Sequence, residues 1–141
     1  ETFQKSLFAL HALSIKVIVH LILGLPHETR EMMSASVQAI ANLPVWGIKL
    51  QLLHVLSGTD LAAYYEKTHF PVFSMDEYCE MIIDCLELLP PEMVIHRITG
   101  DGPKDLLIAP MWSTGKRTVL NQIHRRLKER NTYQGRLATK R

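Results

Sequence analysis

Apolar residues follow two different spacings along this chain. Near the N-terminus Phe3, Leu7, Leu10 and Leu13 recur every three or four residues, which predicts a helix over residues 2–13. A short run rich in Val and Ile follows and predicts a buried strand. The two patterns recur along the chain. Together they predict strands over 16–23, 47–56 and 94–99 and helices over 29–42, 60–67, 74–89 and 113–131.

Several helix boundaries carry residues that favour helix ends. Thr29 is placed as an N-cap, and Ser74 with Glu77 matches the capping box, in which each side chain bonds the backbone N–H of the other residue. Ser113 or Thr114 is expected to cap the last helix. These residues support the helix starts that the apolar spacing predicts.

The order of the predicted elements restricts the topology. Strands alternate with helices, and each connection between strands is long enough to hold a helix, which favours parallel strands joined by right-handed crossovers. Three strands are too few for a closed barrel, so we expect either a segment of a barrel or a small open sheet. The predicted fold class is therefore α/β, with parallel strands and outer helices.

Ligands of parallel α/β folds bind at the carboxyl ends of the strands. Three predicted loops lie there, and each combines a glycine with a hydroxyl or carboxylate group: residues 24–29, 56–59 and 99–102. Glycine lets a ligand approach the backbone, and the polar groups can bond a ligand. The same residues are equally typical of ordinary turns and helix caps, so both interpretations stay open.

Polar side chains also occur inside the predicted strands. His20 lies in an otherwise apolar strand, on the same side as Gly24 by the two-residue period, and is either a core histidine or a residue that points into a barrel. Lys49 and Gln51 share one side of the second strand, where a polar barrel interior would give them partners. His54 has the opposite orientation near the strand end and is expected to turn toward the barrel mouth.

The composition is that of an ordinary globular chain. Of the 141 residues, 47% are hydrophobic and 21% are charged, which excludes general disorder. The longest apolar run, residues 17–25, is broken by a histidine and is too short to span a bilayer. The N-terminus has neither an initiating Met nor the basic segment of a signal peptide, so we expect a piece of a longer, cytoplasmic protein without membrane contact.

The two cysteines do not form a metal motif. Cys79 and Cys85 have a spacing that matches no common zinc or iron–sulfur pattern, and on a helix they face different sides. We therefore expect two buried thiols, with no disulfide and no metal site in the chain.

Positive charge is concentrated near the C-terminus. Residues 113–141 carry nine Lys or Arg and one acid, a net charge of +8, whereas residues 1–112 carry −6. A basic stretch beside an acidic body is compatible with binding of a polyanion such as tRNA, and equally with a solvated helix and a loose tail after Thr132. We accordingly divide the chain into a body, 1–112, and a basic helix with its tail, 113–141.

Several motifs, taken in order, resemble those of radical S-adenosylmethionine (SAM) enzymes. The segment HLILGLPHET at 20–29 resembles the Gly-Leu-Pro strand end of oxygen-independent coproporphyrinogen oxidases and Elongator-type catalytic subunits. Residues 47–59, which end in a Gly-Thr pair, are similar to the next strand of these enzymes. The stretches HRITGDGP at 96–103, LLIAPMW at 106–112 and TYQG at 132–135 resemble the narrower YhcC/YtqA-type family of predicted Fe–S oxidoreductases.

The resemblance implies the C-terminal half of a partial (βα)6 TIM-like barrel. In such enzymes a CxxxCxxC loop holds a [4Fe–4S] cluster that binds SAM, whose reductive cleavage gives a 5′-deoxyadenosyl radical for hydrogen abstraction. This sequence lacks those three cysteines. The chain alone is therefore expected to be inactive, to need the N-terminal half of the same protein as its partner, and to bury its open barrel face by self-association.

The resemblance also implies which residues bind the cofactor. The strand end that packs against the SAM adenine in such enzymes falls on Ile22, Gly24, Leu25 and Pro26, with His20 below them. His20 stands where many relatives have Asp.

The substrate is expected to contact the later strands, through Lys49, Gln51, His54, His96, Arg97, Thr99 and Asp101. Arg97 could clamp a carboxylate or phosphate, and Asp101 could accept hydrogen bonds. Alternatively, these two residues form an internal pair that braces the barrel mouth. The alternative to an enzyme fragment is a small α/β module that binds RNA or a protein through its basic last helix.

Overall fold

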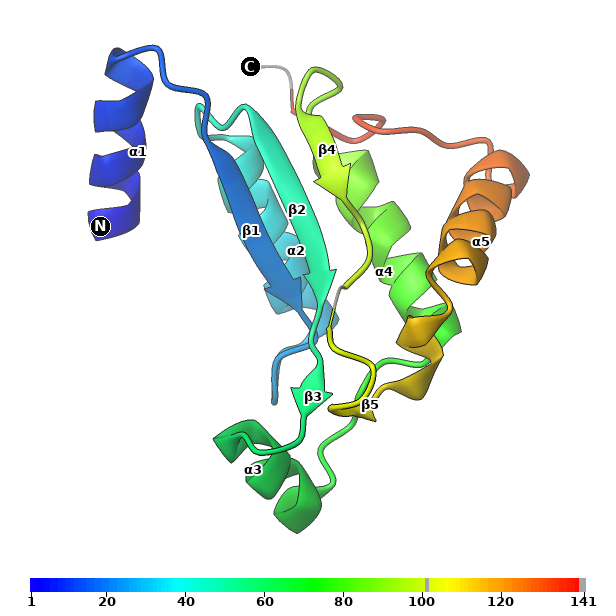
Figure 1. Cartoon of the computed structure of the whole chain (residues 1–141). Helices are drawn as coiled ribbons and strands as arrows, with labels where there is room; N and C mark the ends of the chain where they lie inside the picture. Colours follow the sequence, from blue (N-terminus) through cyan, green and yellow to red (C-terminus); the bar gives the residue numbers. More distant parts are fainter. Residues whose placement is uncertain (101, 140–141) are drawn as a thin grey trace.

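A three-stranded parallel sheet organises the chain, and the computed structural model describes residues 1–100 and 102–139 (Figure 1). The elements in chain order are α1 (Thr2–Ala12), β1 (Ile18–Leu23), α2 (Arg30–Ala41), β2 (Gly47–Leu52), β3 (Val55–Leu56), α3 (Asp60–Thr68), α4 (Met75–Leu88), β4 (Val94–Arg97), β5 (Leu107–Ala109), a 3-10 turn (Met111–Thr114) and α5 (Lys116–Glu129).

The parallel sheet has the strand order β1-β2-β4 and is covered by helices on one face. Figure 1 shows α2 and α4 behind the sheet, and α5 packs against α4. Apolar side chains from the strands and these helices meet in one core, whose fully buried members include Leu23, Val37, Ile48, Leu50, Met81, Ile82 and Ile123. The predicted α/β class with parallel strands and outer helices is confirmed.

The opposite face of the sheet is not covered by any of the described elements (Figure 1). Side chains of a strand alternate between the two faces. In β1, Leu21 and Leu23 point to the core, whereas His20 and Ile22 are exposed, and 44% of the surface of Ile22 is accessible. The uncovered face is therefore the side from which a ligand can approach the strands.

The predicted strand over 47–56 is divided in two. β2 ends at Leu52, and β3 leaves the parallel sheet to pair antiparallel with β5. The sequence did not indicate β5, because three residues are too few to show a period and their partner lies some fifty residues earlier. This small sheet has a core of its own with α3, formed by Leu53, Val55, Ala62, Phe70 and Ala109.

Two of the three predicted caps are confirmed. The Thr29 side chain accepts a hydrogen bond from the N–H of Met32, and Ser74 with Glu77 forms the reciprocal capping box. The cap of the last helix is wrong: α5 follows Gly115 and has no side-chain cap. Ser113 and Thr114 belong instead to the preceding 3-10 turn, where their hydroxyls donate to carbonyls three residues earlier.

The segment after α5 is anchored as far as Leu137, so the predicted loose tail is wrong over that length. The backbone N–H groups of Gly135 and Leu137 donate to the carbonyls of Leu86 and Glu87 at the end of α4. The Gln134 side chain donates to the carbonyls of Pro90 and Met93. The bond from Leu137 satisfies a carbonyl, that of Glu87, which the end of α4 leaves open.

Helix α1 stands beside the outer edge of β1, apart from the other helices (Figure 1). Leu7 is its buried residue, and Phe3, Phe8 and Leu10 are exposed. Among the helices in the described part of the chain, none combines the length and apolarity needed to cross a membrane.

Candidate functional site

Three cationic or ionisable side chains form a row across the uncovered face of the sheet. The parallel register pairs His20 with Lys49 on β2, and Lys49 in turn with Arg97 on β4. In the next row toward the carboxyl ends, Ile22 is paired with Gln51. The sequence predicted the shared orientation of Lys49 and Gln51, and the structure places both on this face, half-buried.

A β-bulge in β4 brings His96 and Arg97 to the same face. The register advances two residues on β4 against one on β2, between Ile48 and Lys49. Ile95 and Ile98 both pack against the core, so the two residues between them are directed away from it. A regular strand over 94–99 would have placed His96 and Arg97 on opposite faces, so the bulge is what gathers them.

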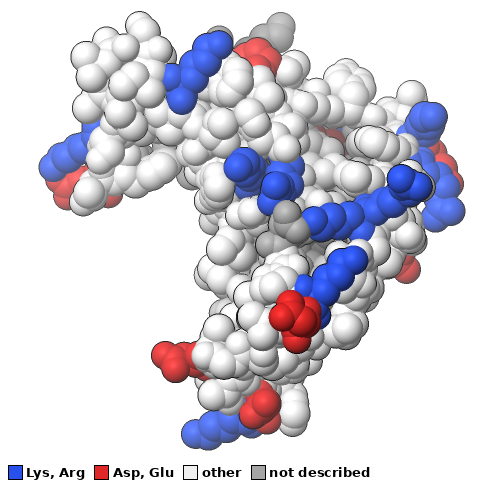
Figure 2. Space-filling view, viewed as in Figure 1, with Lys and Arg blue, Asp and Glu red and all other residues white. Residues whose placement is uncertain are grey.

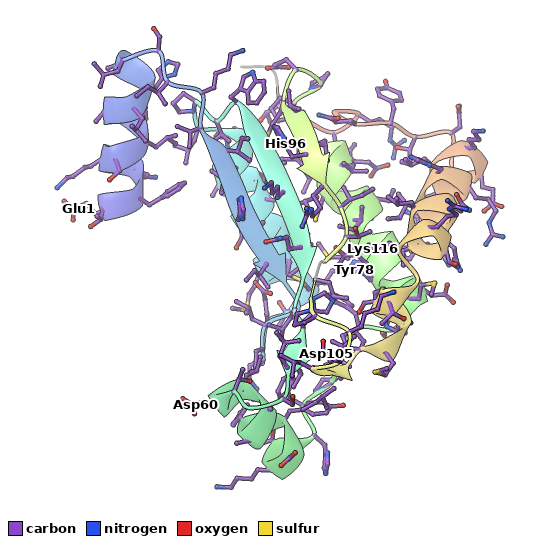
Figure 3. All side chains as sticks on the ribbon, viewed as in Figure 1. Glu1, Asp60, Tyr78, His96, Asp105 and Lys116 are labelled. Carbon is purple, nitrogen blue, oxygen red and sulfur yellow. The ribbon has the colours of Figure 1, made fainter. Side chains whose placement is uncertain are left out.

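Gly47 makes room for His96 on the uncovered face. A Cβ on Gly47 would lie 2.7 Å from Cδ2 of His96, so no larger residue fits without a shift. The imidazole also packs against Trp46, with ring centroids 5.2 Å apart, and Nζ of Lys16 lies 4.7 Å from the centroid of Trp46. His96 is labelled near the amino end of the sheet in Figure 3, so it lies far from the strand ends at which SAM was expected.

The loop that follows β1 is closed by its own carboxylate. Oε2 of Glu28 accepts hydrogen bonds from the backbone N–H of Gly24 at 3.0 Å and of Leu25 at 3.1 Å. Gly24 has φ +85°, and a Cβ there would lie 2.9 Å from the ring of Phe73. Leu25 is 45% exposed, so this loop offers a ligand an apolar side chain and leaves these two N–H groups occupied.

His27 links the same loop to α3. It has a left-handed backbone, with φ +66°, and its Nε2 lies 2.9 Å from the hydroxyl of Tyr64. Tyr64 stacks on Phe70 at a centroid distance of 5.7 Å. A groove of about 590 Å³ lies here, between the loop, α3 and the segment before α4, and its lining includes Gly24, Leu25, His27, Tyr64, Phe70 and Phe73.

His54 does not lie beside Lys49 and Gln51. It sits between β2 and β3, where Nε2 lies 3.0 Å from Oγ of Ser113. Because the Ser113 hydroxyl donates to the carbonyl of Pro110, it accepts from His54. The imidazole also fills the space at Gly100, where a Cβ would lie 2.1 Å from its Cε1. His54 thus joins the small sheet to the loop after β4.

The remaining predicted substrate residues are Thr99 and Asp101. Thr99 follows β4 and is half-buried beside a groove of about 490 Å³, which runs between β4 and α5 and is also lined by Arg97 and His124. Asp101 lies outside the described residues, so both interpretations of the Arg97–Asp101 pair stay predictions. The end of β4 is supported from the core by Tyr78, whose hydroxyl donates to the carbonyl of Ile98 at 3.0 Å.

Two basic side chains, Arg126 in α5 and Arg130 at its C-terminal end, have partners on α4. Arg126 forms ion pairs with Asp76 and Glu80, and Arg130 pairs with Glu80 and Asp84. The basic helix is therefore also a packing helix. Binding of tRNA or another polyanion stays a prediction.

The described residues do not supply ligands for an iron–sulfur cluster. In residues 1–100 and 102–139 no group of three or more His, Cys, Asp or Glu side chains could hold a metal ion. Cys79 and Cys85 are buried in α4, and burial raises the pKa of both thiols, that of Cys85 to about 12. Thiolates are the ligands that a cluster needs, so neither cysteine is suited to that role.

The adenosyl part of SAM, in contrast, fits the end of β1. Ile22 and Leu25 present apolar surface on either side of the chain turn at Gly24, next to an edge of the sheet. An adenine ring packs against apolar surface of this kind.

Comparison with known proteins agrees with the fold. The family described as Radical_SAM C-terminal domain matches residues 45–129. The uncharacterized protein YtqA of Bacillus subtilis is 50% identical over 121 residues, which cover 86% of this chain and 38% of YtqA. Protein YhcC of Escherichia coli K12 is 30% identical over 115 residues, which cover 82% of this chain and 37% of YhcC. The resemblance to YhcC/YtqA-type proteins is thus confirmed, and the chain spans less than two fifths of these relatives.

A solved structure shares the architecture. The archaeal Methanocaldococcus infernus Elp3 with an N-terminal deletion superposes with a TM-score of 0.79 at 18% identity, covering 94% of this chain and 31% of that one. At this identity the likeness concerns the fold alone, and it agrees with the C-terminal portion of a radical SAM fold. The family match extends over more than half of the residues of this chain. The chain therefore belongs to the Radical_SAM C-terminal domain family.

Proposed function

We propose that this chain forms one wall of a radical SAM barrel and binds the adenosyl part of SAM at the carboxyl end of β1. The observation that carries the proposal is the uncovered face of a parallel sheet whose first strand ends in exposed Ile22 and the loop at Gly24. Ligands of parallel sheets bind at this end of the strands. The proposed contact with the adenosyl group is formed by Ile22, Gly24, Leu25 and Pro26. His20 lies on the same face of β1, two residues before Ile22.

The backbone of β1 supports the same role. The carbonyls of Val17 and Leu23 accept bonds from N–H groups on the β2 side. Because backbone groups alternate in direction along a strand, those of His20 and Ile22 point to the outer edge. They are in place to bond either a ligand or a neighbouring strand of a larger barrel.

Three side chains keep this site in shape. Glu28 holds the two N–H groups of the loop, Phe73 packs against Gly24, and His27 ties the loop to Tyr64. SAM with a [4Fe–4S] cluster, when bound, supplies radical chemistry for hydrogen abstraction. We propose that the cluster thiolates come from a segment outside these 141 residues, since relatives such as YtqA are more than twice as long as the matched part.

SAM binding by the chain tests the proposed site. Ile22→Asp places a charge where the adenine would pack and is expected to weaken SAM binding at least tenfold in equilibrium dialysis. Ile15→Asp is the matched control, because Ile15 is 48% exposed, much like Ile22, but precedes β1. Equal SAM affinity in the two variants would show that the end of β1 is not the site.

The enzymatic part of the proposal needs the full-length protein. After anaerobic reconstitution with iron and sulfide we expect about four irons per chain. With a strong reductant the protein is expected to convert SAM to 5′-deoxyadenosine. A protein that binds no iron and leaves SAM intact would contradict the proposed activity.

A further inference from the structure

We propose that the row formed by His20, Lys49 and Arg97 on the uncovered face binds a phosphate or carboxylate group of the substrate. The inference rests on the proposed function, because it names the substrate class of the same barrel face. It is carried by the register, the charge and the lack of partners for two of the three side chains.

The register places the three side chains side by side. His20 and Lys49 are paired across β1 and β2, and Lys49 and Arg97 across β2 and β4. Neighbouring strands lie about 4.8 Å apart, so the row extends over roughly 10 Å, which is a suitable width for one or two anionic groups. The bulge before Arg97 is what aligns it with Lys49 instead of leaving it in the core.

The sheet has positive but no negative side chains. The sequences of β1, β2 and β4 contain Lys49, Arg97 and two histidines, and no Asp or Glu. Figure 2, which shows the uncovered face, has Lys and Arg side chains over the sheet and most Asp and Glu toward the margins. Such a distribution attracts an anion and steers it toward the strands.

Two members of the row have no partner among the described residues. The Lys49 ammonium, although half-buried, makes no hydrogen bond or ion pair there, and neither does the His20 ring. A cation that is partly removed from water without an opposite charge is unfavourable, so a bound anion would stabilise it. Arg97 adds a second permanent positive charge to the row.

The methionyl carboxylate of SAM is a second source of the same chemistry. SAM bound through its adenine at Ile22 would bring a carboxylate onto the same face. Competition with SAM distinguishes the two possibilities. A substrate site binds an added anion while SAM is present. If the row binds the SAM carboxylate instead, SAM and the added anion compete for it.

The test is a titration of the chain with inorganic phosphate and, separately, with succinate, in the presence and absence of saturating SAM. Backbone amide NMR reports the binding. Lys49→Gln removes the charge and keeps a polar side chain, and we expect it to weaken phosphate binding about tenfold or more while SAM affinity stays unchanged. Lys67→Gln, an exposed cation at the end of α3, is the control and should bind phosphate as the wild type does.

Each outcome decides a separate point. Stronger binding of phosphate than of succinate identifies a phosphorylated substrate, and the reverse a carboxylate. Equal phosphate affinity in Lys49→Gln and Lys67→Gln overturns the proposal, even if both variants bind SAM. A loss of SAM binding in Lys49→Gln also overturns it. Phosphate binding that depends on Lys49 in a chain that does not bind SAM supports the anion site and contradicts the proposed function instead.

Discussion

Tyr78→Phe removes one oxygen atom from the support beneath the carboxyl end of β4. The Tyr78 ring is fully buried and packs against Phe73 and Trp112, and its hydroxyl donates to the carbonyl of Ile98 at 3.0 Å. Burial raises the pKa of this hydroxyl, so it remains protonated and able to donate. The substitution keeps the ring and its packing, so the change in stability reports the hydrogen bond.

The expected loss of stability depends on the Ile98 carbonyl, which loses its hydrogen-bond donor in this variant. A net hydrogen bond contributes about 0.5–1.5 kcal/mol, and a buried acceptor left without a partner costs about 1–3 kcal/mol. The Ile98 carbonyl is only partly buried, so water can replace some of the loss. We expect the free energy of unfolding to fall by about 1–2 kcal/mol.

Urea unfolding monitored by circular dichroism measures this difference. Tyr65→Phe is the matched control, because the Tyr65 hydroxyl has no hydrogen bond to any described residue, and it should stay within about 0.5 kcal/mol of the wild type. Amide exchange should also accelerate at Ile98 and Thr99 in Tyr78→Phe alone. Equal stabilities of the two variants would refute the view that Tyr78 holds the end of β4.

Three further predictions concern the thiols, the C-terminal segment and the open face. Burial raises the pKa of Cys85 from 9.0 to about 12. Above pH 9.0 the unfolded thiol releases a proton that the folded one retains, so the free energy of unfolding should fall as the pH rises. Urea titrations that show no such fall would contradict this. Gly135→Ala should lower the free energy of unfolding by about 1–3 kcal/mol, since φ at Gly135 is +86° and a Cβ would lie 2.6 Å from Pro91. Gly115→Ala is the control and should lower it less in the same assay, because a Cβ there would meet nothing closer than 3.5 Å. The uncovered face should cause self-association, so light scattering should show a mass that grows with concentration, and a stable monomer would be the contrary result.

Local features of the fold could be predicted because their causes are close in the sequence. The caps at Thr29 and Ser74 depend on bonds that span three residues, and the alternation in β1 and β2 is visible as soon as the strands are placed. The orientation of Lys49 and Gln51 followed from that alternation alone.

Features that depend on distant partners could not be predicted. The pairing of β3 with β5 and the anchoring of Gln134 on Pro90 join segments more than forty residues apart. The alignment of Arg97 with Lys49 depends on a β-bulge that the residue types of β4 do not predict. The contact between His27 and Tyr64 depends on the position of α3. The uncovered face could therefore be predicted in outline, and its arrangement at β4 could not.

The most direct test of the account maps SAM onto the chain. Amide chemical shifts recorded during a SAM titration should change most at Ile22, Gly24 and Leu25, the described N–H groups nearest the proposed adenine contact. A set of shifts confined to α5, or none at all at saturating SAM, would contradict the assignment of this sheet face to the cofactor.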